Sequence, residues 1–152
     1  NVMIIANPSV VNIHSSDKFP GIDVLMYHGY SLTFYGDQVD SLRASGKNVS
    51  DRAIYAMRYL LKRRHLSPTH GSTLYVPNKE KDLLVIESVP DVFVSGHIHK
   101  AGVLNYKNVQ LICSSCWQEK TDFQEKMGHE PDPCRVPLLN LQTRNVKILN
   151  FE

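Results

Sequence analysis

Two histidines separated by one residue follow a short apolar run in the segment VFVSGHIHKAG, residues 92–102. His97 and His99 come directly after Ser95-Gly96 in this segment. Alternate residues of an extended chain point to the same side, so both imidazoles could aim at one point, with Gly96 allowing a tight turn beneath them. This arrangement would suit a pair of metal ligands. Two unrelated surface histidines at the end of a strand are the alternative.

A third histidine ends another apolar run. Residues 22–27 read as a central strand that is covered on both faces, and His28 and Gly29 follow it directly. Histidines at strand ends lie at the rim of a sheet, where loops carry functional groups on a rigid scaffold. Three imidazoles there would suit Zn²⁺, Mn²⁺ or Fe²⁺, whereas a two-metal centre would also need carboxylates. Candidate carboxylates, none with a telling spacing, are Asp37, Asp40 and Asp91.

The rest of the chain supplies the elements that must position these residues. Residues 51–64 carry apolar side chains at helical spacing, with Ser50 as a suitable N-cap and a basic last turn. The polar, glycine-interrupted residues 30–50 read as a long loop. Apolar runs bounded by turn residues predict strands over 2–6, 10–14, 22–27, 83–86, 92–95, 102–106, 109–113, 137–141 and 146–151. One helix among many strands predicts the α/β class, as a layered β-sandwich with flanking helices.

Composition narrows the class of protein further. The 152 residues are compatible with one domain, and a net charge of +2 is too small to argue for nucleic-acid binding by itself. Three cysteines, an odd number, favour reduced thiols in a cytoplasmic protein, and no apolar run approaches the roughly 18 residues that cross a bilayer. Cys113-x-x-Cys116 lacks a second pair to complete a zinc site, so we expect these thiols to pack near Trp117. Because the chain lacks an initiator methionine, we expect it to be a piece of a longer protein.

Longer blocks carry a resemblance to a known family. His28-Gly29 followed by Gly96-His97-x-His99 resembles the C-terminal half of the calcineurin-like metallophosphoesterases. The blocks around Trp117 and around residues 63–66 resemble, more narrowly, the small subunit of archaeal family D DNA polymerase. The matching blocks stand in family order and cover most of the chain: VLMYHGYS, MRYLLKRRHLSPTHG, VPDVFVSGHIHKAGVLNYKNV, CWQEKTDFQEKMGHEPDP and RVPLLNL.

The resemblance implies a two-metal phosphodiesterase that acts as a 3′-to-5′ proofreading exonuclease beside a large catalytic polymerase subunit. His28 and His97 match ligands of one metal ion, and His99 matches a ligand of the other. The implied cofactors are two divalent ions, Mn²⁺ first, with Mg²⁺, Fe²⁺ or Zn²⁺ as alternatives. The implied partners are the large subunit, the single-stranded 3′ end of DNA and, through the full complex, a sliding clamp; no membrane is implied.

The chain also departs from the family pattern. The earlier metal-binding motifs of the family are absent, and Asn7-Pro8 has proline where the last of them has histidine. We therefore expect residues 1–152 to be the C-terminal part of a metallophosphoesterase domain whose upstream half is missing. On its own, this part should be inactive.

Other functions stay open at this point. A non-catalytic scaffold subunit of a DNA polymerase is one alternative, and a generic metallophosphoesterase is another. Upstream motifs rich in carboxylates would favour catalysis, and degenerate ones would favour a scaffold. Arg63 and Arg64 either complement the dipole at the end of a helix or contact DNA phosphate or the large subunit.

Overall fold

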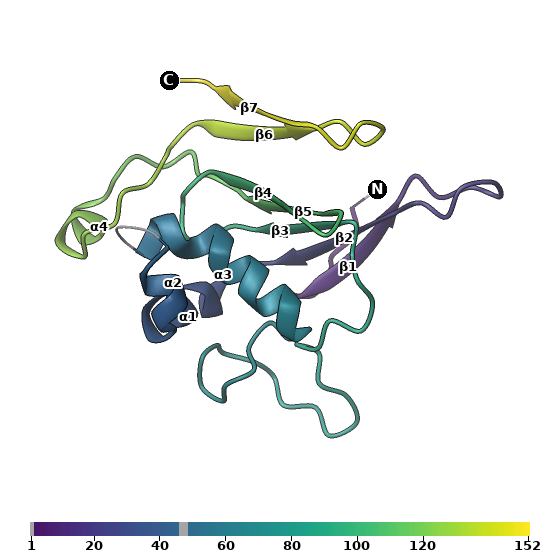
Figure 1. The fold of residues 1–152 in the computed structure, drawn as a ribbon, viewed down its shortest axis with the longest axis horizontal. Coiled ribbons are helices and arrows are strands. Elements are labelled where there is room, and N and C mark those ends of the chain that lie inside the picture. The colour runs from purple at the N-terminus through teal and green to yellow at the C-terminus, as the bar shows by residue number, and fades with distance from the viewer. Residues whose placement is uncertain (1, 46–48) are drawn as a thin grey trace.

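A five-stranded mixed sheet forms the centre of the computed structural model, which describes residues 2–45 and 49–152 except for the side chains of Val49 and Ser50. The strands lie in the order β1-β2-β3-β5-β4 (Figure 1). The three inner strands run parallel, and the edge strands β1 and β4 are antiparallel to their neighbours. The strand bounds are β1 Ser9–Ile13, β2 Ile22–Tyr27, β3 Val92–Ser95, β4 Gly102–Tyr106 and β5 Val109–Cys113.

The two faces of this sheet are covered by different structures. Phe93 and Leu111, both fully buried, face the helices α1 (Tyr30–Gln38), α2 (Asp40–Arg43) and α3 (Val49–Arg63). The alternate residues Val92 and Ile112 face a hairpin of β6 (Arg135–Leu139) and β7 (Val146–Asn150), as expected from the two-residue period of a strand. In Figure 1 the helices and the hairpin lie on opposite sides of the sheet. The α/β class is therefore confirmed, with a second sheet of only two strands among the described residues.

Helix α3 forms close to where the sequence predicts it. Ala56, Met57 and Leu60 recur at helical spacing and are completely buried against the sheet. The helix begins at Val49, so Ser50 lies inside it rather than before it; the predicted capping contact of the Ser50 side chain falls outside the described residues. Lys62 and Arg63 end the helix, where positive charge opposes the partial negative charge of the free carbonyls.

Three predicted elements are wrong. Residues 2–6 form no strand, because this β-branched run has no neighbouring strand to pair with; Val2 and Ile4 are each 95% exposed. The predicted loop over 30–50 contains α1 and α2, which bury Leu32 and Leu42 in the core. Residues 83–86 make only an isolated bridge, between Val85 and His65, and no strand. With α4 (Asp122–Lys126), the described residues contain four helices rather than one.

The other predicted elements are confirmed within a residue or two. Strand β2 and strand β3 have the predicted bounds, and β4 and β5 form the predicted hairpin. The C-terminal hairpin is β6–β7. No helix among the described residues has both the length and the apolar character needed to cross a bilayer.

Candidate metal-binding site

Parallel pairing of β2 with β3 brings His28 and His97 together. Tyr27 lies opposite Ser95 in the register, so the chain leaves both strands at the same edge of the sheet. His28 directly follows Tyr27, the last residue of β2. His97 lies two residues after Ser95, the last residue of β3, with Gly96 between them. Nδ1 of His97 lies 3.1 Å from Nε2 of His28, and the ring centroids are 4.9 Å apart. Two of the three predicted metal ligands, His28 and His97, therefore contact each other.

The backbone of His28 is fixed on both sides. Its N–H donates to Oδ1 of Asn7 at 2.8 Å. Its carbonyl oxygen accepts from the N–H of Gly96 at 3.1 Å and from the hydroxyl of Ser95 at 3.2 Å. Because Ser95 is buried, these bonds hold the end of β2 against the end of β3 and orient the imidazole of His28. Asn7 and Ser95 are positioning residues that the sequence reasoning missed.

Gly29, rather than Gly96, is the glycine that this geometry requires. Gly29 has φ of +112°, a left-handed conformation that residues with a Cβ rarely adopt, and an added Cβ would lie 2.5 Å from Oγ of Ser95. An added Cβ on Gly96 would lie 4.0 Å from its nearest neighbour, the carbonyl oxygen of His28. The turn after β2 therefore depends on a glycine, whereas the backbone at Gly96 does not require one.

The Gly96-His97-Ile98-His99 segment is not extended, so the argument that alternate residues point the same way is wrong here. His97 and His99 each have φ of +59°, and the N–H of Ile98 donates to the carbonyl of Gly96 at 2.6 Å. Ile98 is 4% exposed and packs into the core. Two left-handed residues around a buried isoleucine cost conformational energy, and such strain gathers at functional sites.

His99 makes a different contact. Its Nδ1 lies 3.0 Å from Nε2 of Gln124 in α4, and its carbonyl accepts from the N–H of Asp132. Gln124 is itself fixed by Thr121, since the two residues form a capping box at the start of α4. Within the described ranges, no group of three or more His, Cys, Asp and Glu side chains is arranged to hold a metal ion.

The His97 imidazole is biased toward its neutral form. Burial lowers the pKa of His97, and the charges of His28, His99 and His129 lower it further. A neutral imidazole keeps a lone pair for a metal ion, which a protonated one lacks. The same interactions show that His99 and His129 lie within electrostatic reach of the pair.

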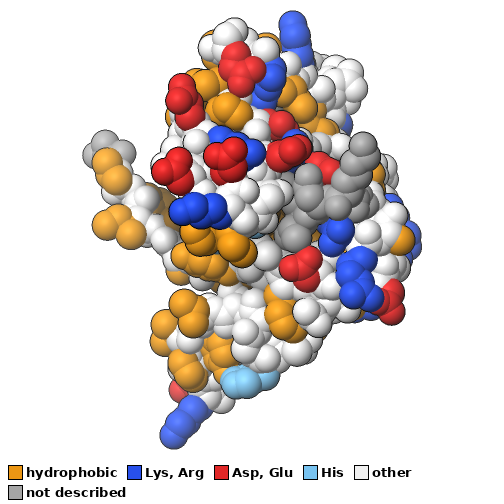
Figure 2. Space-filling model, turned by 90° about the vertical axis from the view of Figure 1, so that its left-hand side faces the viewer, with side chains coloured by type: hydrophobic (Ala, Val, Ile, Leu, Met, Phe, Trp, Pro, Cys, Tyr) orange, Lys and Arg blue, Asp and Glu red, His pale blue; other side chains and the backbone are white. Residues whose placement is uncertain are grey.

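The donor set of the pair fits one ion. Each nitrogen of a pair of imidazoles binds an ion at about 2.1 Å, and a separation of 3.1 Å between the two nitrogens allows both to reach the same ion. Tyr30 closes one side, with its ring centroid 4.7 Å from that of His28 and 4.6 Å from that of His97. Figure 2 shows one face of the molecule, on which most of the Asp and Glu side chains lie in the upper half among Lys, Arg and hydrophobic side chains.

The three candidate carboxylates are engaged elsewhere. Asp40 pairs with Arg43 on α2, and an oxygen of Asp37 lies 3.5 Å from Nη1 of Arg52. Asp91 precedes β3, at the opposite end of the strand from His97, and accepts from Arg144 at 2.6 Å. None of the three is placed beside the histidine pair by these contacts.

The two arginines at the end of α3 differ from each other. Arg64 donates through Nε to the carbonyl of Ile86 at 2.7 Å and through Nη2 to the carbonyl of Glu87, which fixes the loop after the helix. Arg63 is exposed, and its guanidinium carbon lies 3.3 Å from the centre of the Tyr59 ring. Arg64 therefore has a structural role, and Arg63 keeps its charge at the surface.

The cysteines and Trp117 differ in burial. Cys113 is buried in the main core, whereas Trp117 is 68% exposed and its ring lies 5.9 Å from that of Phe151. Cys113 ends strand β5, as expected of a strand-end thiol, and its buried environment differs from that of the exposed indole. Cys116 lies in a partly buried segment, where its carbonyl accepts from the N–H of Cys134 at 2.8 Å.

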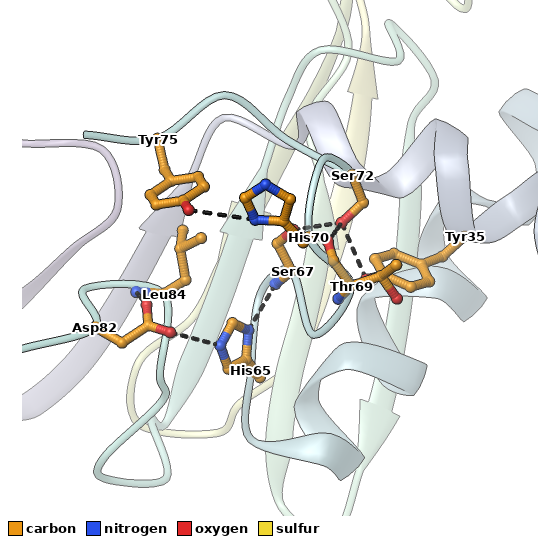
Figure 3. A network of polar contacts seen from close by, with 9 residues as sticks. All are labelled: Tyr35, His65, Ser67, Thr69, His70, Ser72, Tyr75, Asp82 and Leu84. Carbon is orange, nitrogen blue, oxygen red and sulfur yellow. Dashed lines mark hydrogen bonds and ion pairs between the residues drawn. The ribbon is translucent and has the colours of Figure 1, made fainter. Parts of the chain in front are cut away.

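A second group of polar side chains lies in the segment after α3 (Figure 3). Nε2 of His65 lies 3.0 Å from Oδ2 of Asp82, while its Nδ1 accepts from the backbone N–H of Ser67 at 2.9 Å. The hydroxyls of Ser67 and Ser72 contact each other, and Tyr35 lies 3.0 Å from Ser72. Because His65 accepts from a backbone group and not from a hydroxyl, it activates no nucleophile; the network ties the loop to α1.

The fold and the paired histidines define an α/β protein with a candidate metal site at one sheet edge, and comparison with known proteins adds the family. No family model matches the chain. It is 40% identical over 148 residues to the DNA polymerase II small subunit of Halobacterium salinarum, covering 97% of this chain and 27% of that protein. It is 37% identical over 152 residues to the same-named subunit of Thermoplasma acidophilum, covering 100% of this chain and 29% of that protein.

A third relative gives the same result. The chain is 38% identical over 141 residues to the DNA polymerase II small subunit of Methanocaldococcus jannaschii, covering 93% of this chain and 22% of that protein. The resemblance to the archaeal small-subunit family is confirmed: over nearly its whole length, the chain is homologous to these subunits. It spans about a quarter of their length.

Proposed function

We propose that the chain is part of the small subunit of an archaeal replicative DNA polymerase and contributes to a metallophosphoesterase domain that removes nucleotides from a 3′ end. The contact between His28 and His97 is the observation that carries the proposal. Two imidazole nitrogens 3.1 Å apart at a sheet edge suit a shared ion. The similarity to proteins named DNA polymerase II small subunit supports the proposed place of the chain in a polymerase.

In this proposal His28 and His97 would hold one divalent ion, and His99 would hold the second once it no longer contacts Gln124. The carboxylates that hard ions such as Mn²⁺ or Mg²⁺ prefer come from a part of the domain outside residues 1–152. Two such ions, when bound, would supply positive charge to the phosphodiester oxygens and would make a bound water more acidic. Mn²⁺ is the first candidate, with Mg²⁺, Fe²⁺ and Zn²⁺ as alternatives.

Other residues of this chain orient the imidazole of His28 and set the protonation state of His97. Asn7, Ser95 and Gly96 fix the backbone of His28, so the imidazole needs little reorganisation to bind an ion. The lowered pKa of His97 favours the neutral imidazole, which is the form that binds a metal ion. The partners are the large polymerase subunit and a single-stranded 3′ end, with a sliding clamp reached through the full complex in the cytoplasm.

The test uses the full-length small subunit assembled with its large subunit. A single strand labelled at its 5′ end is incubated with Mn²⁺, and shortening is followed over time. His97→Ala should lower the rate by more than about 100-fold, because loss of a ligand should exceed the 10–100-fold cost of losing a ligand's supporting contact. His14→Ala, at an exposed histidine beyond β1, is the matched control and should leave the rate unchanged. An equal rate in His97→Ala would remove His97 from the reaction.

A non-catalytic scaffold is the second candidate function. It is favoured by the contact of His99 with Gln124 and by the engagement of Asp37, Asp40 and Asp91 with arginines. A scaffold predicts no metal-dependent shortening of the strand by the wild-type complex, together with normal assembly of both subunits. The same assay therefore separates the two functions.

A further inference from the structure

The C-terminal end of α3 borders a pocket of about 470 Å³ that only cations and apolar residues line. Lys62 and Arg64 come from α3 and the residue after it, and Lys107 comes from the turn between β4 and β5. Val89 and Tyr106 provide apolar lining. Among the residues that the structure describes, no acidic one lines this pocket, so it suits an anion that also carries an apolar or aromatic part.

The charges around this pocket are available to a ligand. Lys62, Arg63 and Lys107 are exposed, and in the described part of the chain none of the three makes an ion pair with a carboxylate. Nζ of Lys107 lies 5.8 Å from the centre of the Tyr106 ring, over one of its faces. A cation and an aromatic face are thus presented side by side at the rim of the pocket.

The outer face of α3 continues this pattern. The guanidinium of Arg63 lies over the ring of Tyr59, and that of Arg58 lies 5.5 Å from the centre of the Tyr55 ring. Spacings of three and four residues place these pairs one above the other along the helix. In Figure 1, α3 crosses the front of the sheet with its outer face toward the viewer and no other element in front of it.

We propose that the pocket and the outer face of α3 bind single-stranded nucleic acid. Lys62, Arg63 and Lys107 contact phosphates, while an unstacked base enters the pocket beside Tyr106. The guanidinium plane of Arg63, already held against Tyr59, offers a preformed surface on which another base stacks. Alternating cationic and planar groups favour this partner over an acidic peptide, which would match the charges but leave the stacking surfaces unused.

The surface is separate from the histidine pair. Helix α3 begins beside the edge that carries the histidines, where Asp51 lies 3.8 Å from Lys100. It ends at the opposite side of the sheet, near the start of β5, after 15 residues, or about 22 Å. Binding there needs no metal ion and does not depend on the proposed nuclease reaction.

The test measures binding of a fluorescent single strand to the full-length protein by anisotropy, in EDTA so that the strand is not degraded. Lys62→Ala, Arg63→Ala and Lys107→Ala are combined, and affinity is measured across salt concentrations. Removing three phosphate contacts should lower the slope of log affinity against log salt by about two, with roughly a tenfold loss at low salt. The control combines Lys18→Ala, Lys126→Ala and Lys147→Ala, three exposed lysines on other elements with the same loss of charge.

Two outcomes would overturn the proposal. Equal slopes in both triple variants would mean that the α3 surface contributes no more than general charge. Equal competition by a polyglutamate of matched charge, or equal affinity for a strand that lacks its bases, would assign the surface to acidic polymers in general. Tyr106→Ala should weaken binding of the normal strand and leave the strand without bases unaffected, and thermal melting of each variant checks that it is folded.

Discussion

Nδ1 of His97 lies 3.1 Å from Nε2 of His28, although 69 residues separate the two in the chain. The contact follows from the parallel pairing of β2 and β3, which places both carboxyl ends at one edge of the sheet. Only one proton can lie between these nitrogens, and the pKa of His97 is lowered by burial and by the neighbouring histidines. Both nitrogens could bind one metal ion only if neither carries a proton, and we propose that an ion replaces the proton in this contact.

The two glycines beside the histidines should respond differently to alanine. Gly29→Ala should destabilise the fold by about 1–3 kcal/mol, because it combines a left-handed φ with a Cβ placed 2.5 Å from Ser95. Gly96→Ala should change the free energy of unfolding by less than about 0.5 kcal/mol, since its Cβ meets nothing closer than 4.0 Å. Urea unfolding measures both. A larger loss for Gly96→Ala would contradict the geometry described for the strand ends.

The bond between Asp91 and Arg144 fastens the β6–β7 hairpin to the sheet and should give a pH-dependent stability. Burial raises the pKa of Asp91, but hydrogen bonds from Arg144 and from the N–H of Asp23 outweigh it and lower the pKa overall. A lowered pKa means that the contribution is present above the unfolded-state pKa of about 3.9 and is lost as pH falls through the folded-state value.

Asp91→Asn should therefore lower the free energy of unfolding at pH 7 by about 1 kcal/mol, a modest value because both side chains are more than a third exposed and solvent screens the pair. The difference from wild type should shrink as the pH is lowered toward 3. Asp17→Asn, at an exposed position in the β1–β2 loop, should show neither effect. A difference that stays constant with pH would contradict the role of the ionised carboxylate.

Much of this site could be predicted from sequence because its signals are local. Apolar runs mark β2 and β3, and each is followed within two residues by a histidine. Their parallel pairing then needs no further information to bring His28 and His97 to one edge. By contrast, the backbone of residues 97–99 was predicted as extended. Burial of Ile98 in the core, a tertiary effect, bends this segment instead.

The remaining features depend on contacts that no local pattern encodes. Gln124 meets His99 from 25 residues away, and Asn7 supports His28 from 21 residues away. The sequence pattern does not predict helix α1, because Gly36 and Asp37 interrupt its apolar spacing. Leu32 and Tyr35 of this helix are nevertheless buried. The run over residues 2–6 shows the opposite error, since strand propensity without a partner strand yields no strand.

Cys113 should resist alkylation in the folded protein. Burial in β5 raises its pKa to about 12, so almost none of it is thiolate at pH 8, and reagents cannot reach it. Cys134, which is partly exposed, serves as the internal control. Iodoacetamide treatment at pH 8 followed by peptide mass spectrometry should label Cys134 first and Cys113 only in urea. Labelling of both at one rate without urea would show that β5 opens readily.

The central claim, that His28 and His97 hold one metal ion, is tested most directly by pulsed electron paramagnetic resonance of Mn²⁺ bound to the full-length protein. The account predicts modulation from imidazole nitrogen in the wild type and in His14→Ala, and its weakening in the His28→Ala, His97→Ala double variant. Because nitrogen couples to Mn²⁺ only when it is a ligand or lies very near, the signal reports coordination rather than activity. Unchanged nitrogen modulation in the double variant would show that the ion is held elsewhere and would contradict the account.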